Sequence, residues 1–126
     1  MKFDDFIGAW RLAGFKLIDD AGAQTEPWLE GSDGLLVYSA NGYMSAVVAV
    51  VDTPDGAVKH VAYSGPFEVE DDKVIHHVVM GSDPNLIGRA QTRMTEFDGT
   101  ILTLSSSPSI YGGKNTKALL LWRRAE

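Results

Sequence analysis

Residues 63–80 read YSGPFEVEDDKVIHHVVM, which predicts two β-strands joined by a tight turn at Asp71-Asp72. The register around this turn pairs Glu70–Lys73, Val69–Val74, Glu68–Ile75, Phe67–His76 and Gly65–Val78. Polar and apolar side chains alternate along the first strand, as they do in a strand with one buried face. The buried face then carries Tyr63, Phe67, Val74, His76 and Val78, while His77 faces solvent. The hairpin therefore places an imidazole among apolar side chains.

Strand-like segments continue on both sides of this hairpin. With its two strands, they cover residues 9–18, 35–38, 43–50, 60–70, 73–80, 89–97, 100–106 and 117–124. A short helical turn over residues 3–8, ending at Gly8, precedes them. Successive strands without intervening helices favour an antiparallel meander, and eight strands are enough to close a barrel around one small ligand. We therefore expect an all-β, eight-stranded antiparallel up-and-down barrel, with an open two-sheet sandwich as the alternative.

The connections between these strands alternate in length. Tight turns are expected at residues 39–42, 71–72 and 98–99, where Asn41-Gly42 and Asp98-Gly99 are typical hairpin sequences. Longer connections are expected at residues 19–34, 51–59, 81–87 and 107–116. The tight turns would close one end of the barrel, and the long loops would surround a mouth at the other. Trp28, in the first long loop, is either a lid or a residue packed on the rim.

Composition limits the possible partners. The chain has 126 residues, which suits a single domain over residues 1–126, and a formal net charge of −6. No cluster of basic residues suggests a nucleic-acid partner, and no stretch resembles a membrane span or a signal peptide. We therefore expect a cytoplasmic protein, either monomer or homodimer. Three histidines, no cysteine and no inward-facing acid argue against a metal site, and no nucleotide or cofactor motif is present.

Several segments resemble the lipocalin-like domain family of small calycin-type barrels. They are Gly8-Ala-Trp10, Gly34-Leu-Leu-Val-Tyr38, Asn41-Gly-Tyr-Met-Ser45, Tyr63-Ser-Gly-Pro-Phe67, Val74-Ile-His-His77, Pro84-Asn85 and Arg93. The resemblance implies a barrel closed at one end by the short helical turn. It also implies that Trp10 lies at that end beneath Arg124 or Arg123 of the last strand.

A second hairpin brings polar residues inward. With Asp98-Gly99 as the turn, the register pairs Phe97–Thr100, Thr95–Leu102, Arg93–Leu104 and Gln91–Ser106. Because Leu102 and Leu104 should face the core, Arg93 would point inward at a depth similar to that of His76. No acid shares its face, so a carboxylate, phenolate or enolate of a ligand is a candidate partner. The alternatives are a satisfied core histidine and a register slip that returns Arg93 to solvent.

Two hypotheses about function follow. The first is binding of a small hydrophobic or aromatic molecule, with one acidic or carbonyl oxygen, inside the barrel. Its expected ligand-binding residues are Tyr38, Met44, Tyr63, Phe67, His76, Val78, Asn85, Gln91, Arg93 and Leu104. The second is a cofactor-independent isomerase, cyclase or hydratase/lyase. In that case His76 would be the acid/base, and Arg93 with Tyr63 would stabilise an oxyanion.

Overall fold

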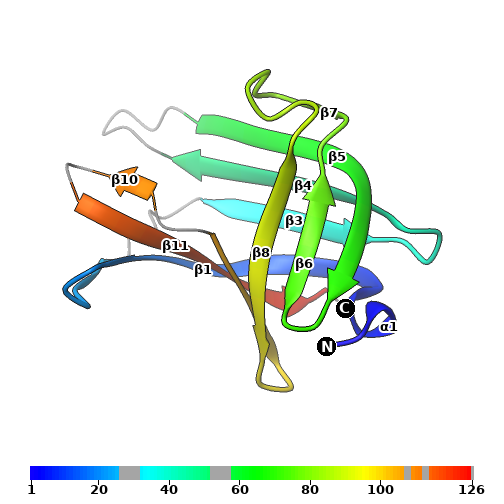
Figure 1. Ribbon diagram of the computed structural model, residues 1–126, viewed down its shortest axis with the longest axis horizontal. Coiled ribbons are helices and arrows are strands. Elements are labelled where there is room, and N and C mark those ends of the chain that lie inside the picture. Colours follow the sequence, from blue (N-terminus) through cyan, green and yellow to red (C-terminus); the bar gives the residue numbers. More distant parts are fainter. Residues whose placement is uncertain (26–31, 52–57, 107–108, 112–113, 126) are drawn as a thin grey trace.

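Eight long antiparallel strands form a closed barrel in the described part of the computed structural model, which comprises residues 1–25, 32–51, 58–106, 109–111 and 114–125 (Figure 1). Around the barrel their order is β1, β3, β4, β5, β6, β8, β9 and β11, and β11 pairs with β1 to close it. The bounds of these strands are β1 Gly8–Asp19, β3 Asp33–Tyr38, β4 Tyr43–Val51, β5 Val58–Glu70, β6 Lys73–His77, β8 Ala90–Phe97, β9 Ile101–Ser105 and β11 Lys114–Arg124. The expected eight-stranded antiparallel barrel is confirmed.

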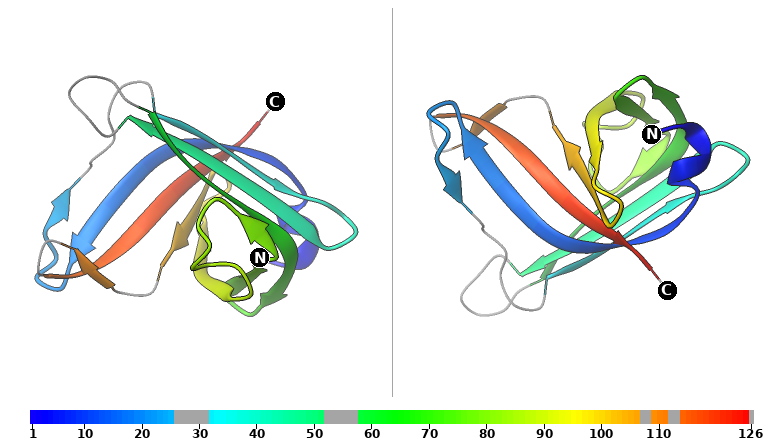
Figure 2. Two further views of the ribbon diagram at one scale, coloured as in Figure 1. Left: turned by 90° about the horizontal axis from the view of Figure 1, so that it is seen from above. Right: turned by 90° about the horizontal axis from the view of Figure 1, so that it is seen from below.

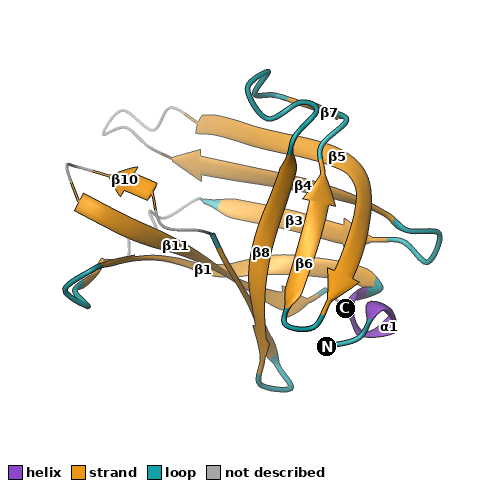
Figure 3. Cartoon of the chain, in the orientation of Figure 1, coloured by secondary structure: helices purple, strands orange, loops and turns teal. Residues whose placement is uncertain are grey.

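A single turn of helix, α1 (Phe3–Phe6), lies beside the end of the barrel at which β1 begins and β11 ends (Figures 1 and 3). Two views along the vertical axis of Figure 1 show β1 and β11 running side by side along the seam (Figure 2). Within the described residues, no helix is long and apolar enough to cross a membrane.

Trp10 is completely buried at the closed end. Its indole N–H donates a hydrogen bond of 2.9 Å to the carbonyl oxygen of Phe6. The guanidinium carbon of Arg124 lies 4.2 Å from the centre of the Trp10 ring, a cation–π distance. Arg124 also donates to the carbonyl oxygens of Ile7 and Asp5, at 3.1 and 2.5 Å. The last strand thus fastens α1 over Trp10, as the family resemblance implied.

Three short strands were not predicted: two lie in expected loops, and the third joins the last residue of the expected strand 73–80 to the loop that follows. They are β2 (Gln24–Thr25), β7 (Met80–Gly81) and β10 (Ser109–Tyr111). β2 folds back on β1 and β10 folds back on β11, so the last long strand begins at Lys114 rather than at residue 117. Residues 26–31, which include Trp28, and residues 52–57 lie outside the described part of the chain.

The first predicted hairpin register is correct from Phe67–His76 to Glu70–Lys73, but the predicted Gly65–Val78 pair does not form. β6 ends at His77, and the Val79 N–H instead donates to Ser64 O, so one extra residue lies on this side of the ladder. The cause is a close backbone approach, since a Cβ on Gly65 would lie 1.7 Å from His77 O. Val78 still points inward and is 2% exposed, and its N–H donates to Arg89 O.

The predicted register of the β8–β9 hairpin is wrong by two residues. Phe97 pairs with Leu102 and Thr95 with Leu104, while Arg93 lies opposite Val74 of β6. The turn is longer than expected because the Asp98 carboxylate accepts hydrogen bonds from the N–H groups of Thr100 and Ile101. These bonds, led by the one from Ile101, lower the pKa of Asp98. A shift of two residues leaves every side chain on its face, so Arg93 remains on the inner side.

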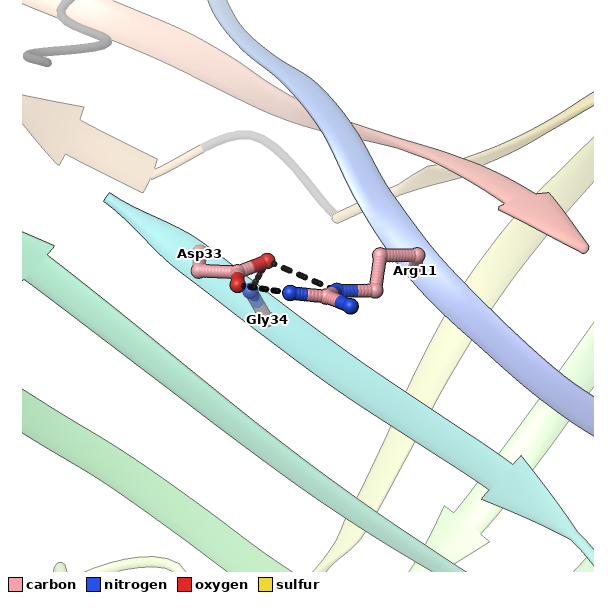
Figure 4. A network of polar contacts seen from close by, with 3 residues as sticks. All are labelled: Arg11, Asp33 and Gly34. Atoms are coloured by element: carbon pink, nitrogen blue, oxygen red, sulfur yellow. Dashed lines mark hydrogen bonds and ion pairs between the residues drawn. The ribbon is translucent and has the colours of Figure 1, made fainter. Parts of the chain in front are cut away.

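On the outer surface, Arg11 of β1 and Asp33 of β3 form an ion pair with N–O distances of 2.5 and 3.3 Å (Figure 4). The Asp33 carboxylate also accepts a hydrogen bond from the N–H of Gly34. The hydrogen bond from Arg11 is the main cause that lowers the pKa of Asp33. The side chains of Arg11 and Asp33 are 64% and 48% exposed, so the pair aligns two neighbouring strands rather than adding much stability.

The close approach at Gly65 predicts that replacing this glycine with alanine destabilises the protein more than the same change at Gly14. Gly65→Ala should lower the free energy of unfolding by about 2–4 kcal/mol, because its Cβ meets the backbone of β6. Gly14→Ala is the matched control: its Cβ would lie 3.9 Å from that of Leu121, an ordinary contact, and stability should change by no more than about 1 kcal/mol. Urea unfolding measures both. Equal stabilities of the two variants would contradict the close backbone approach at Gly65.

Candidate ligand-binding cavity

A cavity of about 190 Å³ lies inside the barrel. Most of its wall is apolar, and three polar side chains from different strands interrupt it. It is lined by Leu36, Ala46, Val48, Val61, Tyr63, His76, Leu86, Arg93, Leu104, Leu120 and Trp122. A concave apolar site with a few polar groups is the usual form of a small-molecule site.

His76 is 2% exposed and is held by two tyrosines. The Tyr38 hydroxyl lies 2.7 Å from Nε2 of the imidazole, and the Tyr63 hydroxyl lies 2.8 Å from Nδ1. These residues come from β3, β5 and β6, and each faces inward because of the alternation along its strand. Both ring nitrogens are therefore satisfied without water.

The imidazole is neutral. Burial, and then the positive charge of Arg93, lower the pKa of His76 to about 3. Burial also raises the pKa of Tyr38 and of Tyr63, although the charge of Arg93 and its hydrogen bonding oppose the shift at Tyr63. All three side chains are uncharged near neutral pH.

A neutral imidazole has one N–H donor and one bare nitrogen, so it donates to one tyrosine and accepts from the other. Tyr38 is buried and has no second hydrogen-bond partner among the described residues, which favours donation from Tyr38 to Nε2. The Nδ1–H of His76 then donates to the Tyr63 oxygen. This arrangement leaves the Tyr63 O–H free to donate to a group in the cavity that Tyr63 lines.

Arg93 of β8 is the charged residue of the cavity wall. One terminal nitrogen donates to Thr92 O at 3.1 Å, and the other donates to Gln91 Oε1 at 3.3 Å. No carboxylate in the described part of the chain forms an ion pair with it. Glu68, which was expected to face outward, does so and pairs with His77 at 2.6 Å.

The structure brings together four of the residues predicted to bind a ligand, since Tyr63, His76, Arg93 and Leu104 line the cavity. Tyr38, Met44 and Phe67 are inside the barrel but belong to its packed core rather than to the cavity wall. The remaining three do not line the cavity: Val78 is buried, Gln91 contacts Arg93, and Asn85 is exposed on the loop before β8.

Seven lining residues were not predicted, namely Leu36, Ala46, Val48, Val61, Leu86, Leu120 and Trp122. The β3–β4 hairpin is apolar on both faces, so alternation alone does not show which side is inward. Trp122 and Leu120 share the inner face of β11, and their period-two spacing was the available signal. The Trp122 indole N–H is buried with no acceptor among the described residues.

Comparison with known proteins agrees with the barrel and its topology. A sequence model described as "Lipocalin-like domain" matches residues 7–61 and 51–125. The chain belongs to the lipocalin-like domain family. The resemblance noted in the sequence is therefore confirmed.

Two individual proteins are similar to this lipocalin-like chain. An Aspergillus oryzae protein named 4'-hydroxy-3'-methoxypropiophenone carrier protein is 40% identical over 78 residues, which cover 54% of this chain and 70% of the relative. A crystal structure of an uncharacterized protein from Bacteroides eggerthii superposes with a TM-score of 0.52 and 13% identity, covering 96% of this chain and 100% of the other. The second likeness concerns the fold alone.

The lowered pKa of His76 predicts a specific pH dependence of stability. Its ordinary pKa is 6.5, so below that pH the unfolded chain takes up a proton that the folded protein excludes until about pH 3. Stability should therefore be lost as the pH falls through this window, by about 2 kcal/mol from this group between pH 7.5 and 5. Urea unfolding at several pH values measures the effect.

His76→Gln should remove this part of the pH slope, whatever its effect on absolute stability. His77→Gln should retain it, because His77 lies on the outer face beside Glu68. An NMR titration of the His76 ring with a midpoint near its ordinary pKa would contradict the neutral, enclosed imidazole.

Proposed function

We propose that the protein binds a small hydrophobic or aromatic molecule carrying one acidic or carbonyl oxygen inside the barrel. The observation that carries this proposal is the apolar cavity into which Tyr63, His76 and Arg93 converge. An apolar cavity of about 150 Å³ accommodates benzene. The volume of about 190 Å³ therefore suits one substituted aromatic ring, with any longer substituent directed to the mouth.

The polar groups of the cavity favour a ligand that accepts hydrogen bonds. Tyr63 has an O–H to donate, because its oxygen is the acceptor for the His76 ring. The guanidinium of Arg93 has only donors. A carbonyl, phenolate or enolate oxygen complements these groups, whereas a ligand that offers only donors would leave them unmatched.

The related Aspergillus oryzae protein supports the same class of ligand. The compound in its name is an aromatic ring with a ketone, a hydroxyl and a methoxy group. Such a molecule has the apolar body and the carbonyl oxygen that the cavity would accept. By this likeness we infer a carrier or binding role for an aryl ketone or a similar compound.

A cofactor-independent isomerase, cyclase or hydratase/lyase is the second candidate. The hydrogen-bonded chain from Tyr38 through His76 to Tyr63 supports it, because such a chain can move a proton into or out of the cavity. The pKa of about 3 argues against it, since a general base works best when its pKa is near the working pH. Binding is therefore preferred over catalysis.

Filling the cavity tests the binding site directly. Ala46→Phe places a ring in the cavity and should weaken the binding of 4'-hydroxy-3'-methoxypropiophenone by about tenfold or more. Ala49→Phe is the matched control, because Ala49 lies on the same strand and lines a hollow of the outer surface. Isothermal titration calorimetry measures both affinities. A loss in both variants, or in neither, would place the ligand elsewhere.

His76→Ala separates the two functions. A binding protein should lose affinity only modestly, because His76 forms a small part of the cavity wall and both of its ring nitrogens are already bonded to tyrosines. An enzyme should lose about 100-fold or more in turnover while it still binds its substrate. Incubation of the protein with a panel of aromatic ketones, followed by NMR detection of products, measures turnover. A product formed by the unaltered protein and lost in His76→Ala would overturn the preference for binding.

A further inference from the structure

In the part of the chain that the structure describes, the interior of the barrel contains a positive charge without a negative partner. Arg93 lines a largely apolar cavity, and no carboxylate of the described residues pairs with it. Its hydrogen bonds go to neutral groups, namely the oxygens of Gln91 and Thr92 and, as its effect on the pKa of Tyr63 indicates, the Tyr63 hydroxyl. A charge close to an apolar wall is better satisfied by an opposite charge than by neutral acceptors.

The ionisable groups around Arg93 do not supply that charge. His76 lies on β6, which pairs directly with β8, and Tyr63 lies on the next strand, β5. Both are close enough for the charge of Arg93 to lower their pKa values, Tyr38 of β3 contacts His76 from the other side, and all three side chains are neutral. On the other side of β8, the inner side chains of β9 are Leu102 and Leu104. The other described charged or ionisable side chains of these strands and of the loop before β8 do not line the cavity; they are Asp33, His60, Glu68, Glu70, Lys73, His77, Asp83, Arg89 and Glu96.

We propose that the cavity binds its ligand as an anion, the conjugate base of a phenol or enol conjugated with a carbonyl group, with Arg93 as the counter-ion and Tyr63 as a hydrogen-bond donor. This inference rests on the proposed function and adds the charge state of the bound molecule. The O–H bond of the ligand breaks, its electron pair stays on the oxygen, and the proton passes to the buffer. No bond to the protein forms.

A single anionic oxygen suits these groups better than a carboxylate. Each terminal nitrogen of Arg93 already donates one hydrogen bond, so the guanidinium is partly committed before a ligand arrives. In the anion of a para-acyl phenol, the negative charge is shared between the phenolic and the ketone oxygen. Either end of such a molecule can therefore lie against Arg93 and gain from its charge.

The test uses 4'-hydroxy-3'-methoxypropiophenone, whose phenolate absorbs at longer wavelength than its phenol. The apparent pKa of the probe is measured by absorption with and without saturating protein. An opposite charge in contact lowers the pKa of an acid by about 1–3 units. We therefore expect the pKa of the bound probe to lie at least one unit below that of the free probe. A shift of one unit means that the phenolate binds tenfold more tightly than the phenol.

Three variants assign the effect to Arg93. Arg93→Met should abolish the shift, and Arg93→Lys should retain part of it, because the charge remains. Arg89→Met is the matched control: Arg89 is exposed just before β8, outside the cavity wall, and the full shift should persist. The methyl ether of the probe, 3',4'-dimethoxypropiophenone, has no phenolic proton to lose. Arg93→Met should therefore change the affinity for this methyl ether by less than about threefold, and its binding also verifies that the variant is folded.

The outcomes separate the two proposals. A bound probe that titrates like the free probe, or a shift that survives in Arg93→Met, would overturn the anion inference and leave the binding function standing. If the unaltered protein binds neither the probe nor its methyl ether, the proposed function itself is overturned, and the inference with it.

Discussion

The architecture depends on satisfying the hydrogen-bonding groups of one almost completely buried imidazole. A buried polar group left without a partner costs about 1–3 kcal/mol, and the His76 ring has two such groups. Tyr38 supplies one partner from β3, 38 residues away in the sequence, and Tyr63 supplies the other from β5, which forms a hairpin with β6. A slip of one residue in β3, β5 or β6 would turn Tyr38, Tyr63 or His76, respectively, to the outside. The polar cluster thus selects one register for three strands that the apolar pattern alone would leave less well defined.

The same cluster lies at the boundary between two parts of the barrel interior. Towards the closed end, large side chains such as Phe6, Trp10 and Phe67 fill the space. Towards the mouth, smaller residues such as Ala46 and Val48 leave the cavity. Tyr38 belongs to the packed core, and Tyr63 lines the cavity. Because both are hydrogen-bonded to His76, the packed core fixes the position of the Tyr63 hydroxyl that the cavity would present to a ligand. Positioning of this kind gives orientation without any movement when a ligand enters.

Much of the fold, and part of the candidate cavity, could be predicted from the sequence. Alternation and turn chemistry place His76 and Arg93 inside, and the inward side of Arg93 survived a wrong register because the error was an even number of residues. The sequence could not show the bulge beside Gly65, since it arises from a backbone contact with β6 rather than from a residue preference. Nor could it show which face of β3 and β4 is inward, because Leu35 and Leu36 are equally apolar. The walls contributed by these strands were therefore missed.

The hydrogen bond from Arg124 to Asp5 of α1 joins positions 119 residues apart in the chain. Pairing of β11 with β1 is thus among the most non-local events in folding, and closing so long a loop has a large entropic barrier. Neither Leu120 nor Trp122 can complete the cavity wall until that seam has formed. A partly synthesised or partly folded chain would therefore expose the aromatic interior of the barrel while having no ligand site. Acquisition of binding is then expected to coincide with the last step of folding rather than to develop gradually.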